Sequence, residues 1–169
     1  MRTITTLHLE HTRQLFFGER ERRESIRSSL STPVAAISFA VFALSTLSAA
    51  VDASRWRDGI TLAILALGSA AVLALFSSAY QVVKSEWLFV YHEPPRLTDI
   101  VDLGTETAEA EEERLRGVLA ASYAVAYEQY LQGNAISSRC RTWALRLILA
   151  SLLLQAVAFA LLPFHQTGS

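Results

Sequence analysis

Two histidines near the beginning of the chain have a spacing that metal sites use. His8 and His11 stand three residues apart with Glu10 between them, and on a helix this spacing brings two ligands to one side of a metal. A zinc site needs at least a third protein ligand, and none is identifiable. The metalloprotease helix has two histidines four residues apart, which this segment lacks. The sequence therefore predicts no metal site here.

Other residue types that do chemistry also lack the partners they need. The acidic run Glu109–Glu113 would splay around a helix axis, as a solvated first turn whose negative charge suits the helix dipole. The single cysteine, Cys140, excludes an internal disulfide and any all-cysteine metal site. His165 is expected to be solvated. With no glycine-rich phosphate loop and no Ser-His-Asp arrangement, we predict neither an enzyme nor a cofactor.

Long apolar windows set the fold class. Hydrophobic residues make up 51% of the 169 residues and charged residues 18%, against about 25% in soluble domains. No charged residue falls within residues 33–51, 60–83 or 147–164, which as helices reach roughly 27–36 Å and match a hydrocarbon core of about 30 Å. A soluble helical hairpin would keep a polar face. We predict an all-α integral membrane protein with three transmembrane helices.

Tryptophan and basic residues predict the orientation of these spans. Trp56, Trp87 and Trp143 lie just outside the windows, where indole rings meet the headgroups. Arginine and lysine gather in residues 1–31 and 84–146, and the turn between the first two spans carries only two arginines. The positive-inside bias places the N-terminus in the cytoplasm and the C-terminus outside.

The parts outside the membrane are expected to be helical and to form one domain with the spans. Residues 1–31 predict a cytoplasmic N-terminal helix, and residues 84–146 predict a cytoplasmic helical segment. In the latter, apolar residues from Leu115 to Tyr130 recur at three- and four-residue spacing, so they need a packing partner. That partner is the N-terminal helix or the same helix of another subunit. Gly133-Asn134 either breaks this helix or lies within it, since glycine costs only about 1 kcal/mol in a helix.

Small and polar residues within the spans suggest packing faces. Ala66, Ala70, Ala74 and Ser78 follow one another at four-residue steps, and small residues let membrane helices approach closely. Gln155 is the most polar residue deep in a span and is able to hydrogen-bond across helices. The spans contact the lipid bilayer, and the absence of charge at membrane depth argues against an ion-coupled transporter.

The layout resembles that of a known group of proteins. The segment YAVAYEQYLQGNAISSRCRTWAL leads into the last span and carries Asn134, Arg139, Arg141 and the pair Trp143-Ala144. A basic helix, two spans and a short turn precede it. In this order the chain resembles the small multi-pass membrane effectors of bacterial antiphage signalling systems, especially the transmembrane effectors of Pycsar-type systems. Those effectors have a basic residue entering the first span, where this chain has Ser31-Thr32.

The resemblance implies an effector of the inner membrane that oligomerises with its own copies and impairs the membrane when triggered. The trigger would be a cyclic nucleotide or a cytoplasmic partner protein, and no nucleic-acid polymer is expected to bind. A ligand would bind near five arginines: Arg20, Arg22, Arg23, Arg139 and Arg141. The alternative is a membrane-anchored scaffold or interaction protein with neither a pore nor enzymatic activity.

Overall fold

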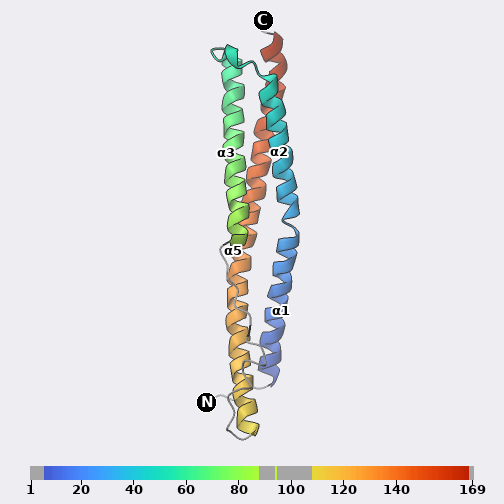
Figure 1. Cartoon of the computed structure of the whole chain (residues 1–169), viewed down its shortest axis with the longest axis vertical. Coiled ribbons are helices and arrows are strands. Elements are labelled where there is room, and N and C mark those ends of the chain that lie inside the picture. Colours follow the sequence, from blue (N-terminus) through green and yellow to red (C-terminus); the bar gives the residue numbers. More distant parts are fainter. Residues whose placement is uncertain (1–5, 88–93, 95–107, 168–169) are drawn as a thin grey trace. The chain divides into compact units, whose positions relative to one another are not determined.

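Helices account for all the regular structure in the described part of the chain, as a computed structural model shows for residues 6–87, 94 and 108–167 (Figure 1). This confirms the all-α fold class. The elements are α1 (Thr6–Ser28), α2 (Ser31–Ala50), the 3-10 turn η1 (Ala53–Arg55), α3 (Gly59–Trp87) and α5 (Ala108–Thr167). Residues 88–93 and 95–107 of the predicted segment 84–146 lie outside the described residues.

Three helical stretches are long and apolar enough to cross a membrane. They are Thr6–Ala50, which takes in α1 and α2, Gly59–Glu86 and Glu109–His165. The predicted windows 33–51, 60–83 and 147–164 lie within these stretches apart from Val51, which follows the end of α2. By length and composition, the chain is a helical, multi-pass membrane protein.

The chain divides into two compact units. Unit 1 comprises Met1–Ser28 and Leu88–Ile136, and unit 2 comprises Ser29–Trp87 and Ser137–Ser169. Helix α5 contributes to both, because it runs without interruption from Ala108 to Thr167. Of the two alternatives at Gly133-Asn134, the structure therefore shows the continuous helix.

Unit 1 is held together by an aromatic side chain of α1. Phe16 is 2% exposed, and its ring centroid lies 5.5 Å from that of Tyr123 and 5.4 Å from that of Tyr130. Ala126 completes the cluster, and spacings of three and four residues place these α5 side chains on one face. Of the two partners that the sequence allowed for this stripe, the structure shows the N-terminal helix.

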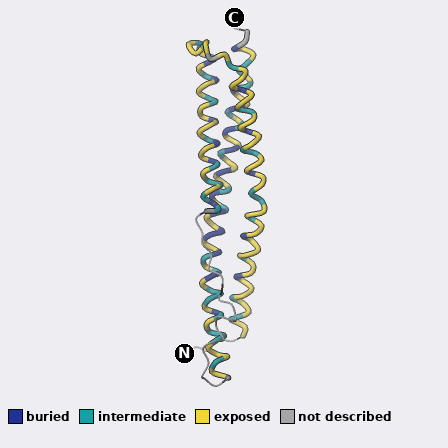
Figure 2. The backbone as a smooth tube through the Cα atoms, viewed as in Figure 1, coloured by how far each residue is buried: buried dark blue, intermediate teal, exposed yellow. Residues whose placement is uncertain are grey.

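Unit 2 is built from α2, α3 and the remainder of α5, which lie side by side in Figure 1. The turn around η1 reverses the chain between α2 and α3, and Asp52 caps it by accepting a hydrogen bond from the Ser54 backbone N–H at 3.0 Å. Pro33 stands in the first turn of α2, where its missing N–H costs no helical hydrogen bond. Figure 2 shows buried residues recurring along each helix while much of the surface is exposed.

Replacing Phe16 by alanine should loosen unit 1, because truncating a buried aromatic residue costs about 3–5 kcal/mol. Phe17 is a matched control, since it is 43% exposed. Hydrogen exchange of the α1 amides, measured by mass spectrometry on the purified protein, should be faster in Phe16→Ala than in Phe17→Ala. Equal exchange in the two variants would contradict the packing role of Phe16.

Candidate functional site

Serine hydroxyls join α3 to α5 at seven-residue intervals. Three of them donate to a carbonyl oxygen on the opposite helix: Ser137 to Ser85 at 2.8 Å, Ser78 to Ala144 at 3.1 Å, and Ser151 to Ala71 at 3.0 Å. Positions fall by seven along α3 while they rise by seven along α5. The two helices are therefore antiparallel and share a heptad register. We call these six residues the heptad seam.

The heptad seam requires the two helix backbones to lie close together. A serine hydroxyl sits on a short side chain, so it reaches an opposite carbonyl only across a narrow gap. Accordingly, Ala71, Ala144 and Ser78 are each 0% exposed. Small residues at such positions are typical of helix pairs in membranes, where a cross-helix hydrogen bond contributes about 0.6 kcal/mol on average.

Helix α2 joins the bundle with the same repeat. Its buried residues are Pro33, Ala40 and Leu47, seven residues apart. Leu47 packs with Ile64 of α3 and Ala158 of α5, which themselves follow the heptad seam by one further step. All three helices therefore present a residue to the interior at the same interval, as in a three-helix coiled coil.

Gln155 lies inside unit 2 and acts on the seam indirectly. It is 2% exposed, and its Nε2 donates to Ser151 Oγ at 3.1 Å on the same helix. Ser151 in turn makes the cross-helix hydrogen bond to the Ala71 carbonyl. The other amide atom of Gln155, Oε1, is buried without a hydrogen-bond partner in the described part of the chain.

The small-residue ladder predicted on α3 turns out to occupy several faces of this helix. Ser78 is buried and Ala74 is half-buried, whereas Ala66 and Ala70 are exposed. Each residue four positions further along a helix is rotated by about 40° around the helix axis. The buried residues of α3 recur instead at alternating steps of three and four. Only Ser78 belongs to both patterns. Packing of Ala66 and Ala70 against a second copy stays a prediction.

His165 corrects the expectation of a solvated side chain. It is 2% exposed, because its ring lies against the turn between α2 and α3. Nε2 accepts a hydrogen bond from the Asp52 backbone N–H at 3.2 Å, and Nδ1 lies 2.9 Å from Thr61 Oγ1. An accepting Nε2 carries no proton, so the pattern assigns the neutral ring with its proton on Nδ1, donated to Thr61.

Two further groups fasten this turn. Arg55 donates from Nη1 to the His165 carbonyl oxygen at 2.9 Å. The Asp52 carboxylate accepts from the Ser54 hydroxyl at 2.7 Å and from the Ser54 backbone N–H at 3.0 Å. These bonds, and then the nearby Arg55 charge, hold the pKa of Asp52 below its ordinary value of 3.8. A lowered pKa stabilises the fold above the unfolded-state value, and this contribution is lost as the pH falls through the folded-state pKa.

Unit 1 contains a buried amide that faces α1. Asn134 is 0% exposed, and its Nδ2 donates to the backbone oxygen and to Oε2 of Glu19, both at 2.8 Å. The Asn134 Oδ1 atom is buried without a partner in the described part of the chain. This contact ties the charged part of α1 to α5.

The five arginines predicted to bind a ligand are divided between the two units. Arg20 and Arg22 are exposed and each faces a carboxylate of its own helix: Arg20 lies 3.9 Å from Glu24, and Arg22 lies 3.4 Å from Glu19. Arg23 is 8% exposed. In unit 2, Arg139 is exposed and Arg141 is half-buried. Ligand binding by these arginines stays a prediction.

The residues singled out for metal chemistry do not gather. Among the described residues, no group of three or more His, Cys, Asp or Glu side chains is placed to hold a metal ion. His8 and His11 are both exposed on α1, and Cys140 is a buried free thiol. The buried polar atoms of unit 2 instead join helices to one another.

The sequence carried a signal for the heptad seam and His165 that was missed. Ser137, Ala144, Ser151, Ala158 and His165 follow one another at seven-residue steps, a small or polar residue each time. A search at a period of 3.5 residues, in place of four-residue steps, would have found this series and placed His165 on the buried face.

Enlarging the heptad seam should destabilise the bundle. Ala71→Leu adds three carbons where the exposed fraction is 0%, and overpacking costs about 1–3 kcal/mol. The neighbouring Ala70 is exposed, so Ala70→Leu is the matched control and should leave stability nearly unchanged. Unfolding by sodium dodecyl sulfate from mild detergent measures both variants. Similar midpoints for the two would argue against a tight α3–α5 contact.

Removing the ring of His165 should free the turn between α2 and α3. His165→Ala leaves the Asp52 N–H and the Thr61 hydroxyl without their partner; Thr61 is 0% exposed, and an unsatisfied buried polar group costs about 1–3 kcal/mol. We expect faster hydrogen exchange at the Asp52 amide and a lower melting temperature. Phe164→Ala, at a position that is 61% exposed, serves as control. Unchanged exchange at Asp52 in His165→Ala would contradict this role.

Comparison with known proteins assigns no family to this chain. No family model, no curated protein and no solved structure matches it. The function proposed below therefore rests on the layout of the chain and on the continuity of α5 through both units.

Proposed function

We propose that the chain is a signal-responsive effector of the bacterial inner membrane, acting in antiphage signalling. A trigger acts on unit 1, the spanning helices of several copies then assemble, and the membrane is impaired. The layout resemblance to Pycsar-type transmembrane effectors supports this proposal. The distribution of basic residues supports a cytoplasmic N-terminus and an external C-terminus.

The observation that carries the proposal is the continuity of α5. One uninterrupted helix of 60 residues belongs to unit 1 at its beginning and to unit 2 at its end. A helix is stiff along its axis, so a ligand that shifts or rotates α5 in unit 1 also acts on the heptad seam. Such a ligand biases the chain toward one of two packings to the extent that it binds one of them more tightly.

The trigger is proposed to be an anionic ligand or a partner protein that meets the arginines of α1. Arg20 and Arg22 face glutamates now, and a phosphate would compete with these carboxylates for the guanidinium groups. Displacement of Glu19 would also affect Asn134, because Glu19 accepts two hydrogen bonds from that amide. Ligand binding and the position of α5 are linked in this way.

Assembly of copies is proposed to use the exposed small residues of α3. Ala66 and Ala70 are exposed in the single chain, and together they offer a smooth strip to another helix. Phe76, which is 72% exposed, lies beside this strip, and Leu73, which is 68% exposed, continues its face because it follows Ala70 by three residues. A helix from a second copy is able to pack along it without disturbing the heptad seam.

The effector proposal predicts loss of membrane potential only when the trigger is present. Bacteria expressing the chain with a nucleotide cyclase should lose the fluorescence of a potential-sensitive dye, and cells with either protein alone should keep it. The double variant Ala66→Leu and Ala70→Leu should block the loss, because it removes the smooth strip. Val83→Ala, at an exposed position on another face of the same helix, is the control and should behave as the unchanged chain does.

Intact membrane potential with every cognate cyclase and partner would contradict the effector proposal. It would favour the scaffold function, which one observation supports. On the part of α5 in unit 1, Val118 and Val125 are 42% and 53% exposed, seven residues apart on one face. Two such apolar side chains in the stripe offer a docking surface to a partner protein.

A further inference from the structure

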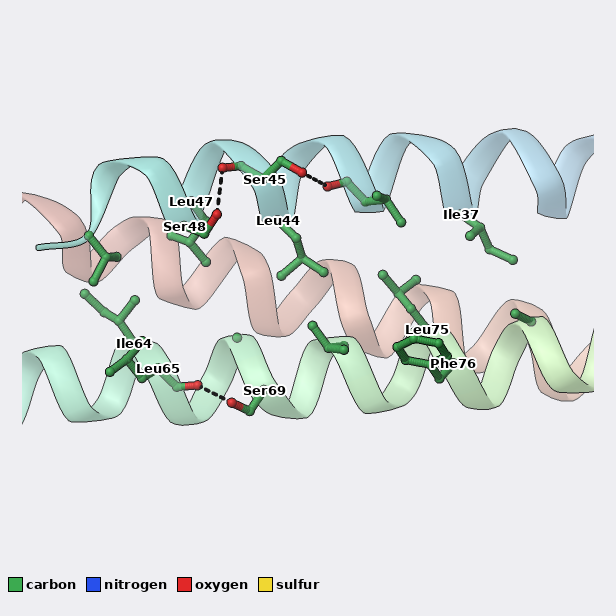
Figure 3. A pocket seen from close by; sticks show the side chains of 15 residues that line it. Ile37, Leu44, Ser45, Leu47, Ser48, Ile64, Leu65, Ser69, Leu75 and Phe76 are labelled. Atoms are coloured by element: carbon green, nitrogen blue, oxygen red, sulfur yellow. Dashed lines mark hydrogen bonds between the residues drawn. The ribbon is translucent and has the colours of Figure 1, made fainter. Parts of the chain in front are cut away.

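An open apolar groove lies between α2 and α3 on one side of unit 2. Its cavity volume is about 730 Å³, and all its lining residues except Val51, which follows α2, come from these two helices. Figure 3 shows Leu44 and Leu47 of α2 facing Ile64 and Leu75 of α3 across it, with α5 behind. Apart from Val51, the lining side chains lie within the candidate membrane spans.

Small residues make the groove hollow. Gly68 lines it on α3, and a Cβ atom added there would meet nothing within 4 Å. Ser69 on the same helix and Ser45 and Ser48 on α2 also line it. The open space therefore follows from the side chains present, and a larger residue at position 68 would enter it without a clash.

The groove offers hydrocarbon and no free hydroxyl donor from its serines. Each lining serine donates its hydroxyl hydrogen to a carbonyl oxygen of its own helix: Ser45 to Val41 at 3.0 Å, Ser48 to Ser45 at 2.9 Å, and Ser69 to Leu65 at 2.8 Å. A phosphate or another anionic group would lose its hydration here and find no donor among these serines to replace it. The occupant that suits this lining is an unbranched apolar chain.

The length of the groove matches a chain of that kind. Along α2 the lining runs from Ile37 to Ser48, which corresponds to about 17 Å of helix, and Val51 extends it just beyond the helix end. One leaflet contributes about half of a hydrocarbon core of roughly 30 Å. A lipid tail that enters at Val51 thus has contact with the protein over its whole depth in the leaflet.

Beyond Val51 the chain enters the turn of residues 52–58, which lies outside the groove lining and carries Arg55 and Arg57 as well as Asp52 and Asp58. Arg57 is exposed and stacks on Trp56, with its guanidinium carbon 5.1 Å from the indole centroid. Among the described residues it has no acidic partner within ion-pair distance. Trp56 is 57% exposed, as is usual for indole rings at headgroup level. A lipid phosphate at this end would find a guanidinium group that suits it.

We propose that the α2–α3 groove is a binding site for an anionic phospholipid, with one acyl chain along Gly68 and the phosphate at Arg57. An arginine near a membrane surface favours anionic lipid by about 1 kcal/mol. This corresponds to an approximately fivefold preference over a zwitterionic lipid with the same tails. The site goes beyond the effector function and does not depend on its trigger.

The experiment compares lipids that stay bound to the purified full chain in native mass spectrometry, after incubation with phosphatidylglycerol or phosphatidylcholine of equal chain length. The unchanged protein should retain phosphatidylglycerol about fivefold better. Arg57→Gln should remove this preference. Gly68→Leu should lower the retention of both lipids, and Ser48→Leu on the opposite wall provides a second filled groove. Ala156→Leu, at an exposed position of α5 outside the lining, should match the unchanged protein.

Three results would overturn the proposal. The first is wild-type retention of lipid in both filled-groove variants. The second is an unchanged preference for phosphatidylglycerol in Arg57→Gln. The third is a dimer mass for the unchanged chain that becomes monomeric in Gly68→Leu and Ser48→Leu, since the groove would then hold a second copy of the chain.

Discussion

The close approach of α3 and α5 is the constraint on which the rest of unit 2 depends. Lipid tails are as apolar as leucine, so the hydrophobic effect does not draw membrane helices together. Contact must come from packing and from hydrogen bonds, and both require a small residue at each level. Ser78 opposite Ala144 and Ser151 opposite Ala71 meet this requirement. Because the seam residues are small, the bulk of the side chains is on the outside, where Phe42 and Phe76 are more than two-thirds exposed.

The membrane spans could be predicted from the sequence, but the side of each span that faces the interior of the bundle could not, because the lipid surroundings are apolar. A window without charge, such as residues 60–83, is a property of composition and needs no knowledge of neighbours. In a soluble helix a polar face marks the outside, but in lipid the outside is apolar as well. The inward direction of α3 therefore had to be inferred from small residues alone. Ser78 fits both a four-residue spacing and a seven-residue spacing. The four-residue spacing was followed, and it predicted a packing face that contains Ala66 and Ala70.

His165 shows why single residues are harder to place than elements. Near the end of a span, a histidine has solvent close by, and solvation was the reasonable expectation. What buries it is a contact with Thr61 and the Asp52 N–H, more than one hundred positions away in the sequence. The α2–α3 groove could not be predicted from the sequence for a related reason, because a groove depends on which faces of two helices meet. The packing of the N-terminal helix on α5 was easier to predict, because the apolar stripe on α5 requires an apolar partner, although the sequence did not single out Phe16.

The heptad repeat of small residues decides how readily α5 can slide along α3. If α5 moved along α3 by one heptad, about 10 Å, Ser137 would stand opposite Ser78, but Ala144 would stand opposite Ala71, where neither side chain has a hydroxyl, and Ser151 would stand opposite the larger Ile64. The order of serine and alanine along the seam therefore favours the observed alignment, in which each level has a serine hydroxyl. The contacts of His165 with the Asp52 N–H and Thr61 would also be lost in such a shift. The imidazole near the end of α5 thus adds a second constraint on how far α5 can slide along its neighbours.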